Sequence, residues 1–177
     1  VIAATNSAAM AVRLTRREGG NGHASFSRDG SRIFFTSGHG QTQDVWVMNA
    51  DGSDQRRLTT TPGPDGSPEI SPDGRSVVFY SERDGNPELY CVKLSGGQLE
   101  RLTRDPAYDT HPSWSSDGRR LLFVGVPRSA TQRRYTWFLT EVADDRPVAV
   151  NADDVLGAPN GQVPTPSQWR PDNRVLF

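Results

Sequence analysis

Two histidines and two aspartates, spaced by multiples of 44 residues, are the side chains in this sequence best suited to bind a ligand. His23 and His111 lie 88 residues apart, and Asp65 and Asp109 lie 44 residues apart. Imidazole and carboxylate together suit several divalent metals, so one hypothesis is a metal or acidic-ligand site that uses all four. The other hypothesis is that these polar groups cap loop backbone, as Asn and Asp often do.

Metal binding is the weaker hypothesis, because two histidines and loosely placed carboxylates do not make a defined ligand set with supporting partners. We therefore predict no metal and no cofactor. We expect any ligand to be a protein or a peptide. The residues predicted to contact it are His23, Asp65, Tyr108, Asp109 and His111.

Motifs for catalysis are absent from the sequence. There is no Gly-x-Ser-x-Gly nucleophile elbow, no His-Glu-x-x-His zinc motif and no Cys-x-x-Cys pair. The segment 51–54 superficially resembles a calcium loop, but it lacks the twelve-residue pattern and lies where a hairpin turn is expected. The sequence therefore predicts a protein that is not an enzyme and has no catalytic residue.

Charge and composition argue against two classes of partner. The 20 basic and 21 acidic residues nearly balance, giving a net charge of −1, which is not the basic footprint of a nucleic-acid binder. No apolar run approaches the roughly 18 residues that span a membrane, so we expect no membrane insertion. The only cysteine, Cys91, lies in an apolar run and is predicted to be a buried structural thiol.

The candidate residues belong to an internal repeat, which must position them. A Ser-x-Asp-Gly signature places Asp29, Asp73 and Asp117 at a constant step of 44 residues, and a fourth, partial copy follows at Asp172. A Leu-Thr pair keeps the same step, at 14–15, 58–59 and 102–103. Two independent markers in phase are strong evidence of duplication, and a period of this length is typical of stacked structural units.

Each unit contains four short strand candidates and no sustained helical period. The first strands are predicted at 24–27, 68–71, 112–115 and 167–170, and the second at 33–35, 77–79, 121–123 and 175–177. The third strands are predicted at 45–48, 89–92 and 137–139, and the fourth end at 58–59 and 102–103. The second strands are continuous apolar runs, which suit strands covered on both faces. Four strands in about 44 residues predict an all-β fold, a β-propeller built of four-stranded antiparallel blades.

Variable connections are expected to gather at one end of such blades. The turns after the first and third strands are short and uniform, whereas the other connections differ in length from unit to unit. The candidate binding residues immediately precede the predicted first strands, so we expect them at this variable end, around the mouth of the central channel. Variable loops on a rigid scaffold are where binding usually concentrates.

The repeat resembles that of the TolB-like β-propeller family. The match runs from Pro68 to Thr103 through Ser71-Pro72-Asp73-Gly74, Asp84-Gly85-Asn86, Glu88-Leu89-Tyr90 and Arg101-Leu102-Thr103. The unit that starts at Ala24 has Arg28 where proline is usual, and the unit that starts at Pro112 diverges in its second half. The resemblance implies a scaffold that binds other proteins in the periplasm or another extracytoplasmic compartment. The first twelve residues themselves show no signal peptide.

The predicted domain covers residues 1–177, with repeat units at about 24–59, 68–103 and 112–150 and a split blade made of 166–177 and 1–15. That gives about four blades in this chain. Similar propellers usually have six, so three arrangements remain open. They are a closed four-bladed ring, a fragment of a larger propeller, and a homodimer that forms an eight-bladed ring.

The function predicted from these features is a non-catalytic binding scaffold that uses the variable-loop face for a protein or peptide partner. The alternative is the propeller portion of an enzyme. The resemblance offers two such enzymes, a serine peptidase of the prolyl oligopeptidase type with a gating propeller, and an oligogalacturonate lyase. Fold alone does not choose among them.

Overall fold

The fold is known from a computed structural model, which describes residues 11–16, 19–96, 99–104, 108–125 and 136–142 and the backbone of three short strands beyond them. The first sheet contains β1 (Gly20–Phe26), β2 (Arg32–Gly38), β3 (Asp44–Asn49) and β4 (Arg56–Arg57). The second contains β5 (Asp65–Ile70), β6 (Ser76–Ser81), β7 (Glu88–Lys93) and β8 (Glu100–Arg101). The third contains β9 (Thr110–Trp114), β10 (Arg120–Gly125), β11 (Thr136–Glu141) and β12 (Val148–Val150).

Each of these sheets is a four-stranded antiparallel meander in which sequential strands pair. A further pair, β13 (Gln168–Trp169) with β14 (Val175–Leu176), follows the third sheet. The described residues contain no α-helix, and one 3₁₀ turn (Gly40–Thr42) joins β2 to β3. This confirms the predicted all-β class with four-stranded antiparallel units.

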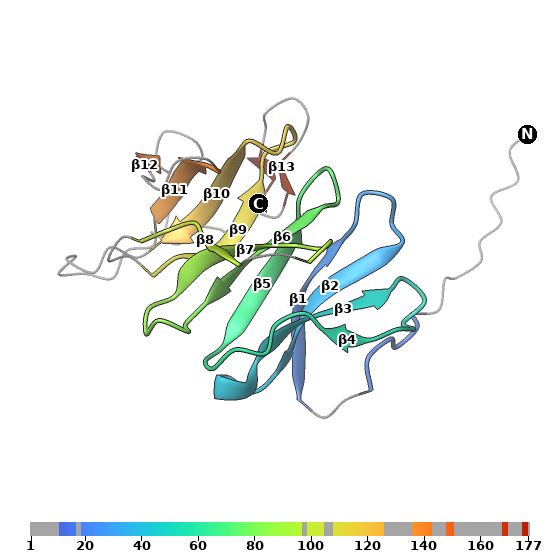
Figure 1. The fold of residues 1–177 in the computed structure, drawn as a ribbon. Coiled ribbons are helices and arrows are strands. Elements are labelled where there is room, and N and C mark those ends of the chain that lie inside the picture. The colour runs from blue at the N-terminus through green and yellow to red at the C-terminus, as the bar shows by residue number, and fades with distance from the viewer. Residues whose placement is uncertain are drawn as a thin grey trace, which may run out of the picture.

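The sheets lie side by side in sequence order (Figure 1). The first strands of successive sheets lie next to one another, because β1 contacts β5, β5 contacts β9 and β9 contacts β13. Connections β2–β3, β4–β5, β6–β7 and β8–β9 lie at one end of the sheets, which we call the loop face. Turns β1–β2, β3–β4, β5–β6, β7–β8 and β9–β10 lie at the other end, the turn face.

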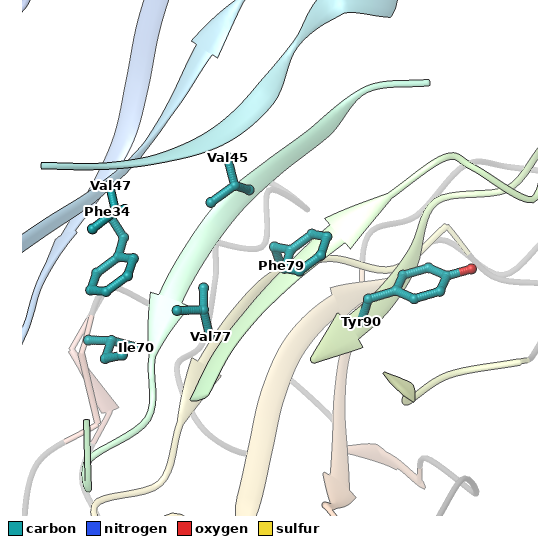
Figure 2. Close-up of a cluster of buried hydrophobic side chains, with 7 residues drawn as sticks. All are labelled: Phe34, Val45, Val47, Ile70, Val77, Phe79 and Tyr90. Carbon is teal, nitrogen blue, oxygen red and sulfur yellow. The ribbon is translucent and has the colours of Figure 1, made fainter. Parts of the chain in front are cut away.

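Apolar side chains from neighbouring sheets form the core between them. Phe34, Val45 and Val47 of the first sheet meet Ile70, Val77, Phe79 and Tyr90 of the second, as Figure 2 shows. Val78, Leu89 and Leu102 of the second sheet meet Trp114, Leu121 and Phe123 of the third. The second strands of all three units therefore bury both of their faces, as their continuous apolar runs predict.

The repeated Ser-x-Asp-Gly signature forms the same turn between first and second strands in all three units. In each, the serine hydroxyl donates to the aspartate carboxylate at 2.6 Å. The backbone N–H two residues after the aspartate donates to the same carboxylate at 3.0 Å. The glycine takes a positive φ of 69° to 73°, where a side chain would be strained. These hydrogen bonds explain why the serine, the aspartate and the glycine keep the same places within each copy of the signature.

Three predicted features need correction. The first strands begin two to four residues earlier than predicted, at Gly20, Asp65 and Thr110. The fourth strands are short and end before the Leu-Thr pairs. The threonine hydroxyls there accept from backbone N–H groups at the start of the third strands, and the threonines do not extend the pairing of the fourth strands. Cys91 is half-buried rather than fully buried; burial still raises the pKa of its thiol to about 11. Trp169 lies in β13, but its side chain, and residues 1–10, lie outside the described part of the chain.

Candidate binding site on the loop face

A β-bulge recurs at the same place in all three first strands. Two consecutive residues, such as His23 and Ala24, face a single residue of the second strand, because the register shifts between Gly22 and Ser25. The same shift occurs in β5 and β9. The first bulge residues are His23, Ser67 and His111, with positive φ of 46°, 47° and 52°. Glycine usually holds such a position, so each side chain is kept there at a cost in backbone strain.

The bulge corrects the predicted location of the histidines. His23 and His111 lie inside β1 and β9, not before them. Period-two alternation fails at a bulge because one extra residue is inserted, so a sequence pattern reads the strand as starting after it. The bulge also re-aims the side chain that it carries.

The two histidines come together although their strands are separated by β5. Their ring centroids lie 5.1 Å apart in an edge-to-face arrangement, with 72° between the ring planes. His23 is exposed and His111 is half-buried. Burial lowers the pKa of His111, and the neighbouring His23 lowers it further. Both histidines therefore belong to one site at the loop face, formed by strands from three units.

Asp65 is fully buried and already paired. Its carboxylate accepts a hydrogen bond from Thr61 at 3.1 Å and forms an ion pair with Arg83 at 3.3 Å. The Arg83 guanidinium also stacks over the Tyr90 ring, 4.5 Å from its centroid. Asp65 therefore anchors the β6–β7 loop to β5 and does not join the histidine pair.

Asp109 and Tyr108 lie in the equivalent connection before β9. Asp109 is fully buried, and its backbone N–H donates to the carbonyl of Pro87 at 2.9 Å. Asp65 makes the equivalent bond to Gln43 at 2.9 Å, so both aspartates tie one unit to the preceding one. Tyr108 is half-buried. Within the residues that the structure describes, no three His, Cys, Asp or Glu side chains are grouped closely enough to hold a metal.

Sequence reasoning missed a second repeated polar cluster at the loop face. Glu88, at the start of β7, accepts hydrogen bonds from Thr103 at 2.7 Å and from Arg101 at 2.8 Å. The Thr103 hydroxyl also accepts from the backbone N–H of Leu89 at 2.9 Å. Asp44, Arg57 and Thr59 repeat the arrangement in the first unit. The available signal was the acidic residue 13 positions before each Arg-Leu-Thr triplet.

Sequence reasoning also missed Glu69, in β5. Its carboxylate accepts a hydrogen bond from the backbone N–H of Trp114 at 3.2 Å, and its backbone carbonyl accepts from the Trp114 indole at 3.3 Å. The equivalent residues in the other units are Ser25 and Ser113. Desolvation raises the pKa of the Glu69 carboxyl to about 8. Only the departure from serine marks this residue in the sequence.

Hollows at the turn face follow the spacing of the units. One, of about 440 Å³, lies between the first two units beside Asp29, Ile70 and Asp73, and another, of about 430 Å³, lies between the next two beside Asp73, Trp114 and Asp117. Because equivalent residues line both, they are products of the repeat. The loop face differs from unit to unit, and there the histidines of two units meet.

The sequence matches the family model for the TolB beta propeller domain over residues 2–176. Among solved structures, TolB from Acinetobacter baumannii is 24% identical with a TM-score of 0.69, and the alignment covers 78% of this chain and 34% of that one. The structure titled putative TolB from Agrobacterium tumefaciens is 26% identical with a TM-score of 0.63, and the alignment covers 70% of this chain and 46% of that one. An oligogalacturonate lyase in complex with manganese is 23% identical with a TM-score of 0.63, covering 89% and 44%.

The chain thus spans between 34% and 46% of the length of these three proteins. No curated protein sequence matches it. The described residues include no helix long and apolar enough to cross a membrane. The structural likenesses support the propeller fold, and they include both TolB proteins and an enzyme.

Proposed function

Because the chain belongs to the TolB beta propeller domain family, we propose that it is a non-catalytic binding scaffold whose loop face docks a protein or peptide partner. One observation carries this proposal. His23 and His111, from the first and third units, meet at the loop face with their rings 5.1 Å apart. The first and third units therefore contribute to one surface, which a partner can contact as a whole.

The loop face is also pre-organised. The ion pair of Asp65 with Arg83 ties the β6–β7 loop to β5, and the ion pair of Glu88 with Arg101 joins β7 to β8. The Tyr90 hydroxyl donates to Asp84 at 2.5 Å, which fixes the tip of the same loop. Less conformational entropy is lost when a partner binds a surface that is already ordered.

The propeller portion of an enzyme is the second candidate, and the likeness to an oligogalacturonate lyase favours it. The full-length reading frame distinguishes the two. Additional sequence that carries a hydrolase domain with its Ser, Asp and His would support the enzyme. An extracytoplasmic location follows only from the family resemblance, and a signal peptide in the reading frame would test it.

Site-specific photo-crosslinking in the native host tests the scaffold function. Crosslinkers at the exposed loop-face positions Gln41 and Pro62 are compared with crosslinkers at the exposed turn-face positions Asp54 and Arg75. We expect one discrete protein adduct from the loop-face positions and none from the turn-face positions. Adducts from the turn face alone, or from neither face, would contradict the proposal.

A further inference from the structure

We propose that the contact between His23 and His111 is a pH-sensitive latch, which holds the first and third units together at the loop face and releases when both rings are protonated. The contact joins β1 to β9, two strands that are separated by β5. The latch itself does not depend on a partner. Its effect on docking rests on the proposed function, because the loop face is the surface that the partner contacts.

The distance between the two rings makes the contact sensitive to charge. Their centroids lie 5.1 Å apart in an edge-to-face arrangement, which is favourable for uncharged aromatic rings. When both rings carry a proton, two positive charges lie well within the screening length of about 8 Å at physiological ionic strength. Their repulsion does not depend on where the ring nitrogens point. The contact therefore changes from attractive to repulsive as the two imidazoles become charged.

The surroundings of His111 make its protonation costly while the contact is closed. Its ring is half-buried, and burial lowers its pKa, as does the neighbouring His23. Its Nδ1 lies 3.0 Å from the hydroxyl of Thr110, which holds the ring in place. Because the pKa is lowered by the fold, the contribution of His111 to stability is present at neutral pH and is lost as pH falls. Acid thus favours an arrangement in which this ring leaves the contact and is solvated.

Nearby charges do not offset the repulsion. The other titratable groups on the elements around the pair are Asp65 and Glu69 on β5, Asp109 before β9, and His39 in the β2–β3 connection beside β1. Asp65 is paired with Arg83, and Glu69 accepts from the backbone N–H of Trp114. Among the described residues, His23 is the one charged group that shifts the pKa of His111. The second proton therefore meets an uncompensated charge.

The bulge that carries each histidine does not itself require an imidazole. Ser67 occupies the equivalent position in β5 with a φ of 47°, against 46° for His23 and 52° for His111. Its short side chain leaves room for the two rings to meet in front of β5. The ring contact can thus be lost without a change in the backbone of the strands, as a reversible latch requires.

Asparagine substitutions test the latch, because asparagine tolerates positive φ better than most residues and carries no charge at any pH. His23→Asn, His111→Asn and the double variant are compared with the parent by denaturant titration, at about pH 7.5 and about pH 5, on either side of the ordinary titration of imidazole. The double-mutant cycle isolates the coupling between the two rings from every other group that titrates in this range, Glu69 included. His39→Asn, which removes an exposed histidine, replaces His111→Asn in the control cycle.

At about pH 7.5 we expect the coupling between positions 23 and 111 to lower the unfolding equilibrium constant about threefold to tenfold. At about pH 5 the coupling should be at least about threefold smaller, or reversed in sign, because both rings are charged. The control cycle with His39→Asn should show a coupling below about twofold at both pH values. A decrease smaller than about threefold for the 23/111 pair, or a coupling that grows in acid, would overturn the proposal.

Nuclear magnetic resonance titration of the His111 ring protons gives a second test, which needs only the single variant His23→Asn. Removing the neighbouring charge should raise the pKa of His111 towards its ordinary value. An unchanged pKa would show that the two rings do not interact, and would overturn the latch even if the double variant did not fold. Photo-crosslinking at neutral pH tests docking separately, so failure of the latch and failure of the scaffold function are distinguishable.

Discussion

Glu69 is the residue whose ionisation should matter most for folding. Its carboxyl has a pKa of about 8 in the fold against an ordinary value of 4.5. Below pH 4.5 the carboxyl is protonated in both states. From pH 4.5 to about 8 it ionises mainly in the unfolded chain, so the free energy of unfolding falls as pH rises and then levels off. Because the residue as a whole is half-buried, water screens part of this effect.

Glu69→Gln should remove this pH dependence. Glutamine keeps an oxygen that can accept from the Trp114 backbone N–H. We expect urea midpoints of the parent to fall between pH 5 and 8 relative to those of the variant. Parallel curves for the two proteins across that range would show that Glu69 ionises normally.

The candidate site shows what single residues reveal before a structure is known. The equivalence of His23 and His111 was readable from their spacing of twice 44 residues. Their contact was not, because it depends on how far the strands turn from one unit to the next. Asp65 was predicted to contact a ligand. Its burial and its pairing with Arg83, a residue 18 positions later, leave no periodic signal, so the sequence did not show that its carboxylate is already paired.

At the scale of the strands, Thr103 caps the first residues of β7. It is buried, accepts from the backbone N–H of Leu89 and donates to Glu88. Thr103→Val keeps the shape of the side chain but leaves that N–H and the carboxylate short of a partner. We expect the variant to lose about 1 to 3 kcal/mol of unfolding free energy.

Thr60→Val is the matched control for that change, because Thr60 follows the equivalent threonine of the first unit and is exposed. Its unfolding free energy should change by less than about 0.5 kcal/mol. Denaturant titration measures both variants. Equal losses of unfolding free energy in the two variants would mean that the cap made by Thr103 does not stabilise the fold.

Element types were predictable where one physical signal dominated. The apolar runs of the second strands and the Asp-Gly turns fixed the order of strands within each unit. The starts of β1, β5 and β9 were missed, because the bulge breaks the alternation of side chains just where each strand begins. The repeat-unit boundaries and the number of blades stay predictions.

At the scale of the whole molecule, stability comes from packing between neighbouring sheets. Trp114 is 6% exposed between the second and third sheets, whereas the equivalent Phe26 of the first sheet is 61% exposed. Trp114→Ala should therefore cost about 3 to 5 kcal/mol. Phe26→Ala should cost less than about 1 kcal/mol in this chain, because little apolar area is lost from the core.

Denaturant titration of the two alanine variants tests this contrast. A loss below about 1 kcal/mol for Trp114→Ala would mean that the residue is exposed and that the phase of its strand is wrong. A large loss for Phe26→Ala would mean that another segment covers the outer face of the first sheet in solution.

The account rests most directly on the convergence of the first and third units at the loop face. A short bifunctional thiol crosslinker measures it in the double variant His23→Cys/His111→Cys, with Cys91 replaced by serine. His23→Cys/Arg75→Cys, which joins the loop face to the turn face, is the control. We expect efficient intramolecular crosslinking of the first pair and none of the control pair. A yield for the 23/111 pair no higher than that of the control would contradict the meeting of the two histidines, and with it the binding site on which the proposed function stands.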